Sequence, residues 1–220
     1  MALIVELVGP AGAGKSALSE HLARRAGVMR ASIWNLPRGA WLLNAVRSLP
    51  TLLAVGVRTR PFPWEDMRHL VRLRTLRQVL ARRRAQQVPL VVLDEGPVYA
   101  LAWLRLFGHQ RRRGDALAPW RQRALEEWAG ALDLVVLVNA PAAVLMERIR
   151  ARDKPHRVKH RTDEEIGAFL AAYRGAFDEV IAALTAKQGV QVVTLDSDAE
   201  AIDRTAARLL ELLEGQVHVA

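Results

Sequence analysis

The sequence predicts an α/β fold of three layers, with helices on both faces of a five-stranded parallel sheet. Two observations lead to this prediction. Several short apolar runs are continuous and do not alternate with polar residues, which is typical of strands buried on both faces of a parallel sheet. Stretches with helical periodicity separate these runs, and a helix is the usual connection between two parallel strands.

Each expected element corresponds to one such run or stretch. Strands are expected at 2–8, 28–34, 89–93, 132–138 and 190–195, of which 28–34 is the shortest signal. Helices are expected at 64–86, 97–112, 119–130, 141–152, 162–187 and 198–214. Segment 38–63 is apolar but contains Pro50, Gly56, Pro61 and Pro63, so a helix, a turn and an exposed arm are expected there.

Two helix starts carry recognisable signals. Pro141 follows the strand expected at 132–138 and suits the first turn of a helix, where its missing N–H is not needed. Thr162 and Glu165 have the spacing of a capping box. These signals predict helices that begin near residues 141 and 162.

Composition excludes several classes of protein. The chain has 220 residues, of which 51% are hydrophobic and 25% charged, which is enough to bury a core and unlike a disordered or fibrous protein. No apolar run approaches the roughly 18 residues of a membrane span. The absence of cysteine excludes disulfides and thiolate metal sites. Because the chain begins inside a strand pattern without a basic leader, a cytoplasmic protein with no membrane partner is expected.

The net charge of +9 is unevenly distributed along the chain. Segments 58–84, 105–123 and 148–161 together carry 22 basic and 4 acidic residues, whereas the rest of the chain is net negative. Such local clusters favour the binding of phosphate groups. The clusters Arg82–Arg84 and Arg111–Arg113 lie at expected helix ends, where cations also stabilise the helix dipole, so a structural role is favoured for them.

A glycine-rich loop joins the first expected strand to a helical pattern. Gly-Pro-Ala-Gly-Ala-Gly-Lys-Ser at 9–16 fits glycine, four residues, then Gly-Lys-Ser, in the strand-to-helix context that a phosphate-binding loop requires. Glycine permits backbone angles that turn successive N–H groups toward phosphate oxygens. Lys15 is expected to reach the β- and γ-phosphates of a nucleotide, and the Ser16 hydroxyl to ligate magnesium. The residues expected to bind the nucleotide are Gly9, Ala11, Gly12, Ala13, Gly14, Lys15, Ser16, Ala17 and Arg148.

Other motifs narrow the class of nucleotide-binding protein. The position at which a GTPase carries Asn-Lys-x-Asp reads Asn139-Ala140-Pro141, and the chain lacks a Leu-Ser-Gly-Gly signature. These two absences argue against a GTPase and against an ABC-type ATPase.

An acidic residue ends the apolar run at 89–93. Asp94 would lie at the edge of the sheet that holds the phosphates, where it could hold magnesium or accept the proton of an attacking hydroxyl. The structural alternative is that Asp94 caps the following helix. Glu95, the next residue, could bind acceptor hydroxyls or magnesium, or point to solvent.

An arginine-rich segment follows the strand expected at 132–138. Arg148 and Arg152 are four residues apart, hence on one helical face, and Arg157 lies in the polar loop beyond. Guanidinium groups match phosphate oxygens and stabilise charge on a transferring phosphoryl group. The alternative is a solvated basic turn.

The order of three features resembles that in the thymidylate kinase and deoxynucleoside kinase group of P-loop kinases. These features are the loop at 9–16, the acidic end of Leu90-Val91-Val92-Leu93-Asp94, and Arg148-Ile149-Arg150-Ala151-Arg152-Asp153 with Arg157. The resemblance covers essentially the whole chain. It implies one kinase domain over 1–215 with a tail at 216–220, an acceptor side at about 34–75 and a lid at about 150–162 that closes over ATP and Mg²⁺. It also implies that Asp94 lies beside the reacting oxygen and that Arg148 and Arg152 contact the donor.

Position 95 departs from this resemblance. The group usually has an arginine after the acidic residue, where it contacts phosphate, and this chain has Glu95. A glutamate there would repel an acceptor monophosphate, so an acceptor that presents hydroxyls, such as a nucleoside or a sugar-like metabolite, remains an alternative.

The acceptor side contains aromatic and basic residues. Trp34, Trp41 and Trp64 could stack on a base, and Arg68 and Arg72, one turn apart, could hold a phosphate, with Arg38 in the same region. The alternative is that these arginines form the solvated face of an amphipathic helix.

The sequence therefore predicts an ATP- and Mg²⁺-dependent kinase of a small acceptor, most readily a nucleoside monophosphate or a nucleoside. The expected catalytic residues are Lys15, Asp94, Arg148 and Arg152, and the expected metal ligands are Ser16 and Asp94. The expected acceptor-binding residues are Trp34, Arg38, Trp64, Arg68, Arg72, Glu95 and Arg157. A homodimer is possible, and the arginine clusters leave a polynucleotide kinase or a nucleic-acid-associated ATPase as a less favoured alternative.

Overall fold

A computed structural model describes residues 2–58, 63–86, 88–108, 117–153, 155–187, 189–198 and 202–217, without the side chains of 55–58 and 214–217. Five parallel strands form one sheet in the order β2-β3-β1-β4-β5. Their bounds are β1 Leu3–Val8, β2 Val28–Ala31, β3 Leu90–Asp94, β4 Leu134–Asn139 and β5 Gln191–Asp196. The parallel pairing and the number of strands confirm the predicted fold class.

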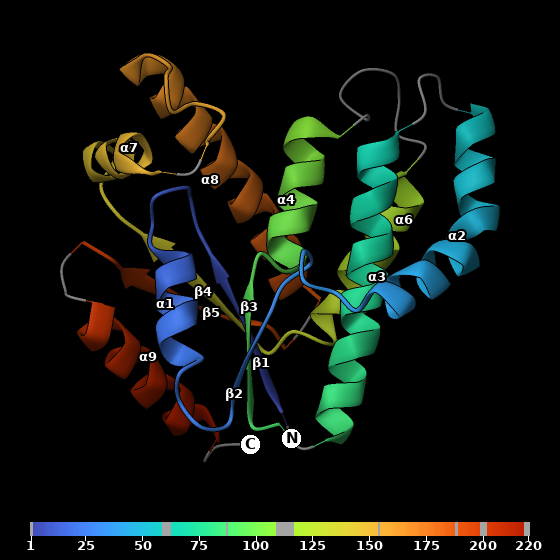
Figure 1. Ribbon diagram of the computed structural model, residues 1–220, viewed down its shortest axis with the longest axis horizontal. Helices are drawn as coiled ribbons and strands as arrows, with labels where there is room; N and C mark the ends of the chain where they lie inside the picture. The colour runs from blue at the N-terminus through green and yellow to red at the C-terminus, as the bar shows by residue number, and fades with distance from the viewer. Residues whose placement is uncertain are drawn as a thin grey trace.

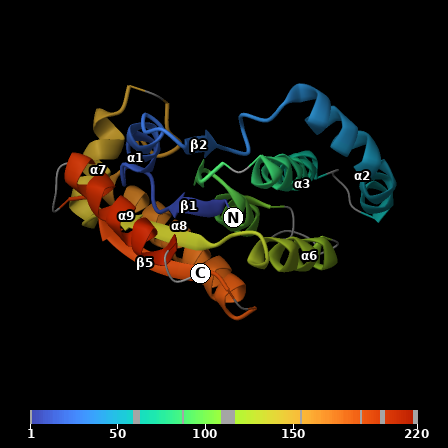
Figure 2. The same cartoon turned by 90° about the horizontal axis from the view of Figure 1, so that it is seen from below.

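Helices connect the strands and cover both faces of the sheet (Figure 1). Their bounds are α1 Lys15–Leu22, α2 Arg38–Arg58, α3 Trp64–Ala85, α4 Pro97–Phe107, α6 Ala118–Ala129, α7 Ala142–Ala151, α8 Asp163–Thr185 and α9 Ile202–Val217. In Figure 2, α1 and α9 lie on one side of the sheet, and α3 and α6 lie on the other. None of these described helices has the length and apolar character needed to cross a membrane.

Two apolar cores follow from this layering. On one face, α1, α7 and α9 pack on the sheet through residues such as Leu18, Leu145 and Leu209. On the other face, α3, α4 and α6 pack through residues such as Leu76 and Leu101. Helix α8 contributes to both cores, because its first turns join the former and its later turns the latter. The strands are therefore buried on both faces, as their continuous apolar runs predict.

Several predicted boundaries are wrong by a few residues. A continuous helix spans Arg38–Arg58 where a helix followed by a turn was expected, and Pro50 lies inside it. Because proline lacks only its own N–H, the chain continues as a helix beyond the lost hydrogen bond. Pro141 precedes α7 as its N-cap instead of occupying its first turn.

Two further predicted boundaries, at the ends of α9 and α4, also differ from those in the structure. Helix α9 continues to Val217, so the tail expected at 216–220 begins as helix, and residues 218–220 lie outside the described part. Helix α4 ends at Phe107 and not at 112. A Cβ at the following Gly108 would lie 2.1 Å from the Leu104 carbonyl oxygen, so only glycine fits this helix end.

The capping box and one arginine cluster are as predicted. The Thr162 side chain accepts from the Glu165 N–H, and Glu165 accepts from the Thr162 N–H, at the start of α8. Arg84, in the last turn of α3, donates to the Ala131 carbonyl at 3.0 Å and to Asp133 at 2.9 Å. Arg84 is thus a structural link between α3 and the segment before β4, whereas Arg111–Arg113 lie outside the described residues.

Candidate active site

The loop at 9–16 has the backbone conformation that its glycines predict. Gly9, Gly12 and Gly14 have φ angles of 148°, 87° and 82°, a range that residues with a Cβ rarely adopt. A Cβ at Gly9 would lie 2.1 Å from the Val138 carbonyl oxygen, and one at Gly12 would lie 2.9 Å from that of Leu145. The loop is therefore seated tightly between the end of β4 and α7.

Lys15, the first residue of α1, lies inside this loop. Its Nζ donates to the carbonyl oxygens of Gly9 at 2.7 Å and Pro10 at 2.8 Å. Burial lowers the pKa of Lys15 to about 8, although Asp94 and Glu95 nearby favour its charged form. The ammonium group is thus held where a phosphate bound by the loop would neutralise it.

This lowered pKa predicts a pH dependence of nucleotide binding. Below pH 8 the amine is charged and attracts phosphate, and above pH 8 it is progressively neutral. We expect kcat/KM for ATP to fall by up to about tenfold per pH unit above pH 8. Initial rates measured between pH 6.5 and 9.5 test this, and a profile that stays flat to pH 9.5 would contradict it.

Asp94, at the end of β3, lies beside the first turn of α1. Strand β3 pairs with β1 so that Asp94 stands opposite Leu7, two residues before the loop. The Ser16 hydroxyl lies 3.4 Å from Asp94 Oδ1. The N-cap of α4 is Gly96, so the structural alternative, in which Asp94 caps that helix, is not what the structure shows.

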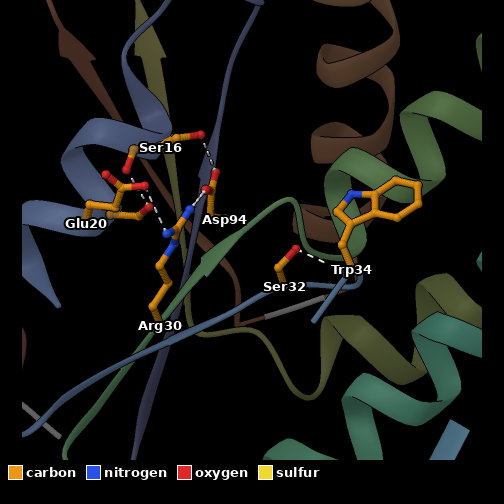
Figure 3. Close-up of polar contacts among 7 residues, drawn as sticks. Ser16, Glu20, Arg30, Ser32, Trp34 and Asp94 are labelled. Atoms are coloured by element: carbon orange, nitrogen blue, oxygen red, sulfur yellow. Dashed lines mark hydrogen bonds and ion pairs between the residues drawn. The ribbon is translucent and has the colours of Figure 1, made fainter. Parts of the chain in front are cut away.

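Arg30 of β2 forms an ion pair with Asp94 that the sequence did not reveal. Figure 3 shows its guanidinium between Glu20 and Asp94, with Ser16 on the other side of the carboxylate. The Arg30–Glu20 distance is 3.2 Å. The Asp94 side chain is only 6% exposed, so the arginine compensates a carboxylate that is largely removed from water.

The oxygen atoms of Ser16 and Asp94 suit magnesium. Mg²⁺ prefers hard oxygen ligands and usually takes one or two from the protein, with the others from phosphate and water. The described residues contain no group of three or more His, Cys, Asp or Glu side chains that could hold a metal ion. Ser16 and Asp94 are therefore the residues that fit such a metal.

Glu95 has an unusual backbone conformation next to the loop. Its φ angle is 64°, and it is the only residue other than glycine with a positive φ among those described. Burial and the neighbouring Asp94 raise the pKa of Glu95, whereas Lys15, a hydrogen bond from Trp34 and Arg152 lower it. A strained residue held in this way suggests a positioned side chain.

Glu6, the only charged residue in β1, accepts hydrogen bonds from the backbone that follows Glu95. Its carboxylate is fully buried and accepts hydrogen bonds from the N–H groups of Gly96, Val98 and Tyr99 at 2.9–3.0 Å. Burial raises its pKa to about 8. A Cβ at Gly96 would lie 2.8 Å from Glu6 Cδ, so the fit requires glycine there. The lone acid in an apolar strand was the sequence signal for this role.

Replacing Glu6 by alanine is expected to lower the free energy of unfolding by about 3 kcal/mol, because three buried N–H groups lose their acceptor. Glu6→Gln retains one acceptor oxygen and is expected to lose less. Urea denaturation of both variants tests this expectation. A change below about 1 kcal/mol in Glu6→Ala would contradict the anchoring role.

A cavity of about 390 Å³ opens in front of the loop. The loop lines it through Gly9, Ala11, Gly12, Gly14, Lys15, Ser16 and Ala17; the other lining residues are Glu95, Tyr99, Arg148, Arg152, His156, Phe169, Tyr173 and Phe177. The structure thus brings together the predicted loop, Glu95, Arg148 and Arg152. His156 and the aromatic residues of α8 were not predicted, because their approach depends on how α8 crosses the sheet.

Arg148 and Ala13 are two further predicted nucleotide-binding residues, and the structure places them differently. Arg148 contacts the Gly12 carbonyl at 3.4 Å and Ser197 at 3.2 Å, with Asp198 at 3.5 Å. It therefore links the loop to the segment after β5. Ala13 is fully buried among the apolar residues on that side and is not among the residues that line the cavity.

Aromatic rings lie beyond Glu95 on the acceptor side. His69 stacks on Trp103 at 4.2 Å and meets the edge of Trp34 at 5.6 Å. The Arg72 guanidinium lies 4.1 Å over the Trp34 ring, and that of Arg157 lies 4.6 Å over Phe107. Two of the predicted acceptor residues, Trp34 and Arg72, thus contact each other.

Other predicted acceptor residues lie elsewhere. Trp64 is 67% exposed, Arg68 is exposed and pairs with Glu65 at 3.2 Å, and Arg38 is exposed at the start of α2. Among the described residues that line the loop cavity, none of these three occurs. Trp34, Arg72 and Arg157 are also absent from the described lining, so Glu95 is the one predicted acceptor residue that the described part of the chain places at this cavity.

Known structures have the same overall fold. The chain aligns with deoxyadenosine kinase from M. mycoides at 11% identity and a TM-score of 0.55, covering 97% of this chain and 100% of that one. YorR protein from Bacillus subtilis aligns at 16% identity and a TM-score of 0.55, covering 98% of both chains. Shikimate kinase from Bacteroides thetaiotaomicron aligns at 18% and 0.51, covering 96% and 98%.

These likenesses show the fold of P-loop kinases, which the order of motifs predicted. No curated protein sequence matches the chain at a significant level. A family model described as an AAA domain, AAA_28, matches residues 4–201, which include the loop, Asp94 and the arginine-rich segment. The chain therefore belongs to the AAA_28 family of P-loop domains.

Proposed function

We propose that the protein transfers the γ-phosphoryl group of ATP to a small acceptor, a nucleoside or a nucleoside monophosphate. One observation carries the proposal: Ser16, within the phosphate loop, lies 3.4 Å from the Asp94 carboxylate at the neighbouring strand end. A phosphate-binding loop beside a largely buried carboxylate is what phosphoryl transfer to a hydroxyl or phosphate oxygen requires.

Each group in the site has a role under this proposal. Lys15 leaves its loop carbonyls and neutralises the β- and γ-phosphates. Arg148 and Arg152 line the same cavity and stabilise charge on the phosphoryl group as it moves. Asp94 orients the acceptor oxygen and, where that oxygen belongs to a hydroxyl group, receives its proton. Ser16 and Asp94 would hold Mg²⁺, which would supply charge stabilisation on the phosphates.

Segment 150–162 serves as a lid in this proposal. Arg152 and His156 already line the cavity from this segment. Burial lowers the pKa of His156, and the charges of Arg152, Arg157 and Lys15 lower it further, which favours the neutral imidazole. Arg152 is the basic residue that the described part of this segment presents to the cavity, and closure of the lid would keep water away from the phosphoryl group.

The acceptor would lie between Glu95 and the aromatic rings. His69 Nδ1 meets the Glu65 carbonyl oxygen at 2.8 Å, so Nδ1 is assigned as its donor and Nε2 as an acceptor. His69 Nε2 and Arg72 Nη1 are buried and have no hydrogen-bond partner among the described residues. An acceptor with both donor and acceptor groups, such as a nucleoside, would satisfy them, and the exposed ring of Trp34 suits a base.

Two other classes of acceptor are alternatives to a nucleoside or a nucleoside monophosphate. Glu95, in place of a phosphate-binding arginine, favours hydroxyl groups, so a sugar-like alcohol is the second candidate. A screen of ADP formation against nucleosides, nucleoside monophosphates, sugar-type alcohols and a mixed oligonucleotide tests the proposal. Stimulation by a small acceptor supports it, whereas stimulation by the oligonucleotide alone would replace it with a polynucleotide kinase.

Replacing Glu95 by glutamine distinguishes the two kinds of acceptor. If Glu95 binds an acceptor hydroxyl, KM for that acceptor is expected to rise about tenfold, because a charged hydrogen bond becomes a neutral one. KM for ATP is expected to change little. A lower KM for a nucleoside monophosphate would instead show that the carboxylate opposes a second phosphate, and steady-state kinetics with both substrates separate these results.

A further inference from the structure

We propose that a groove formed by α2, α3 and α6 is a second anion-binding site, which takes a phosphate-bearing ligand of nucleotide size. The groove has a volume of about 730 Å³, within the range of about 300–1,000 Å³ typical of small-molecule sites. It shares no lining residue with the cavity in front of the phosphate loop. In Figure 2, α2 and α6 flank α3 at the side of the molecule away from α1.

Arginine side chains dominate the electrostatics of this groove. Arg47 comes from α2, Arg74 and Arg77 from α3, and Arg123 from α6. Glu127 is the one acidic residue among those that line the groove, and it is already paired with Arg77 at 3.1 Å. The lining is therefore net positive by three charges.

Two of these arginines are available to a ligand. Arg74 donates to the Ser48 hydroxyl at 3.4 Å, but Arg47 and Arg123 form no ion pair with any described residue. Because like charges that face one groove repel one another, an anion between them stabilises the arrangement. Guanidinium groups on facing helices match the oxygens of a phosphate chain better than a single carboxylate.

The floor of the groove adds an apolar surface to this charge. Leu73, Ala124 and Trp128 are buried beneath it, and Trp120 forms a half-buried wall. Asn44 donates to Gln78 at 2.8 Å at one side, so amide groups lie beside the arginines. A ligand with phosphates at the arginines and a flat ring on the floor fits this combination.

A small ligand suits the groove better than a nucleic-acid strand. Binding of a single strand uses several aromatic platforms in succession along a basic track. Here the described lining offers two tryptophans, of which Trp128 is only 1% exposed. One flat wall and one group of arginines correspond to one nucleotide or to a short polyphosphate.

Isothermal titration with ATP and with inorganic tripolyphosphate tests this proposal. The wild-type protein is expected to bind ATP at two sites per chain, one at the loop and one in the groove. Arg47→Ala/Arg123→Ala is expected to weaken the groove site at least tenfold and to leave the loop site intact. Lys15→Ala is expected to weaken binding at the loop site and to leave the groove site intact. Arg24→Ala/Arg25→Ala, which removes two exposed arginines outside the groove, is the matched control.

The results assign the ligand or reject the site. Equal binding of ATP and tripolyphosphate by the groove identifies a polyphosphate site, and tighter binding of ATP identifies a nucleotide site. A single site that disappears in Lys15→Ala would overturn the proposal, as would unchanged binding in Arg47→Ala/Arg123→Ala. Tighter binding of a mixed oligonucleotide, lost in that double variant, would also overturn it. Kinase activity does not enter this test, so its result is separate from that of the proposed function.

Discussion

Lys15→Ala is expected to lower ATP-dependent phosphoryl transfer by at least about 10³-fold while the protein remains folded. The ammonium group lies inside the loop, where its Nζ contacts the Gly9 and Pro10 carbonyls, and no other lysine of the described residues lines the cavity. Its charge would stabilise the transition state in a site partly closed to water, where such interactions are strong. Initial rates with saturating ATP and the best acceptor from the screen measure the effect.

Lys187→Ala is the matched control for this change. Lys187 follows α8 and pairs with Glu126 at 3.1 Å, on the surface. The Lys187→Ala variant is expected to transfer phosphoryl groups at the rate of the wild type. Circular dichroism and thermal unfolding of both variants establish that the fold is kept. Activity of folded Lys15→Ala within tenfold of the wild type would contradict the role assigned to the loop.

Asp94→Asn is expected to lower kcat by about 10²- to 10⁴-fold, the range typical of a lost general base. The asparagine has nearly the same shape, and its one amide oxygen can still accept the hydrogen bond from Arg30, with its NH₂ group toward the Ser16 hydroxyl oxygen, but it cannot take a proton. Steady-state kinetics at several Mg²⁺ concentrations separate two roles. A loss of kcat at saturating Mg²⁺ indicates the base, and a loss that high Mg²⁺ restores indicates a metal ligand.

Asp178→Asn controls for the change of carboxylate to amide, because Asp178 is exposed on α8. It is expected to retain the wild-type rate. If Asp94→Asn also retains that rate at every Mg²⁺ concentration, Asp94 acts in neither way. Its contact with Arg30 would then be structural.

The sequence predicted those parts of the site that depend on local signals. Gly9, Lys15 and Ser16 are recognisable because a tight phosphate loop needs these residue types at this spacing. Asp94 is recognisable because it ends an apolar strand next to the loop strand. Both predictions follow from the direction of the chain, because the carboxyl ends of parallel strands share one edge of the sheet, where ligands bind.

Other parts depend on contacts between distant segments. The Arg30–Asp94 pair forms because β2 lies beside β3, with Arg30 opposite Val92, and a four-residue strand gives little warning of that register. Tyr173 enters the cavity because α8 crosses both cores. Helix α2 was underestimated because Pro50 is a strong breaker in sequence, yet the helix continues where α3 packs against it.

Transfer of label from [γ-³²P]ATP tests the central claim most directly. The purified protein, ATP, Mg²⁺ and each small acceptor are incubated, and the products are separated by chromatography, with Lys15→Ala in parallel. The proposed function predicts label on a nucleoside or nucleoside monophosphate, and little of it in Lys15→Ala. Label recovered only as inorganic phosphate, whichever small acceptor is present, would contradict it.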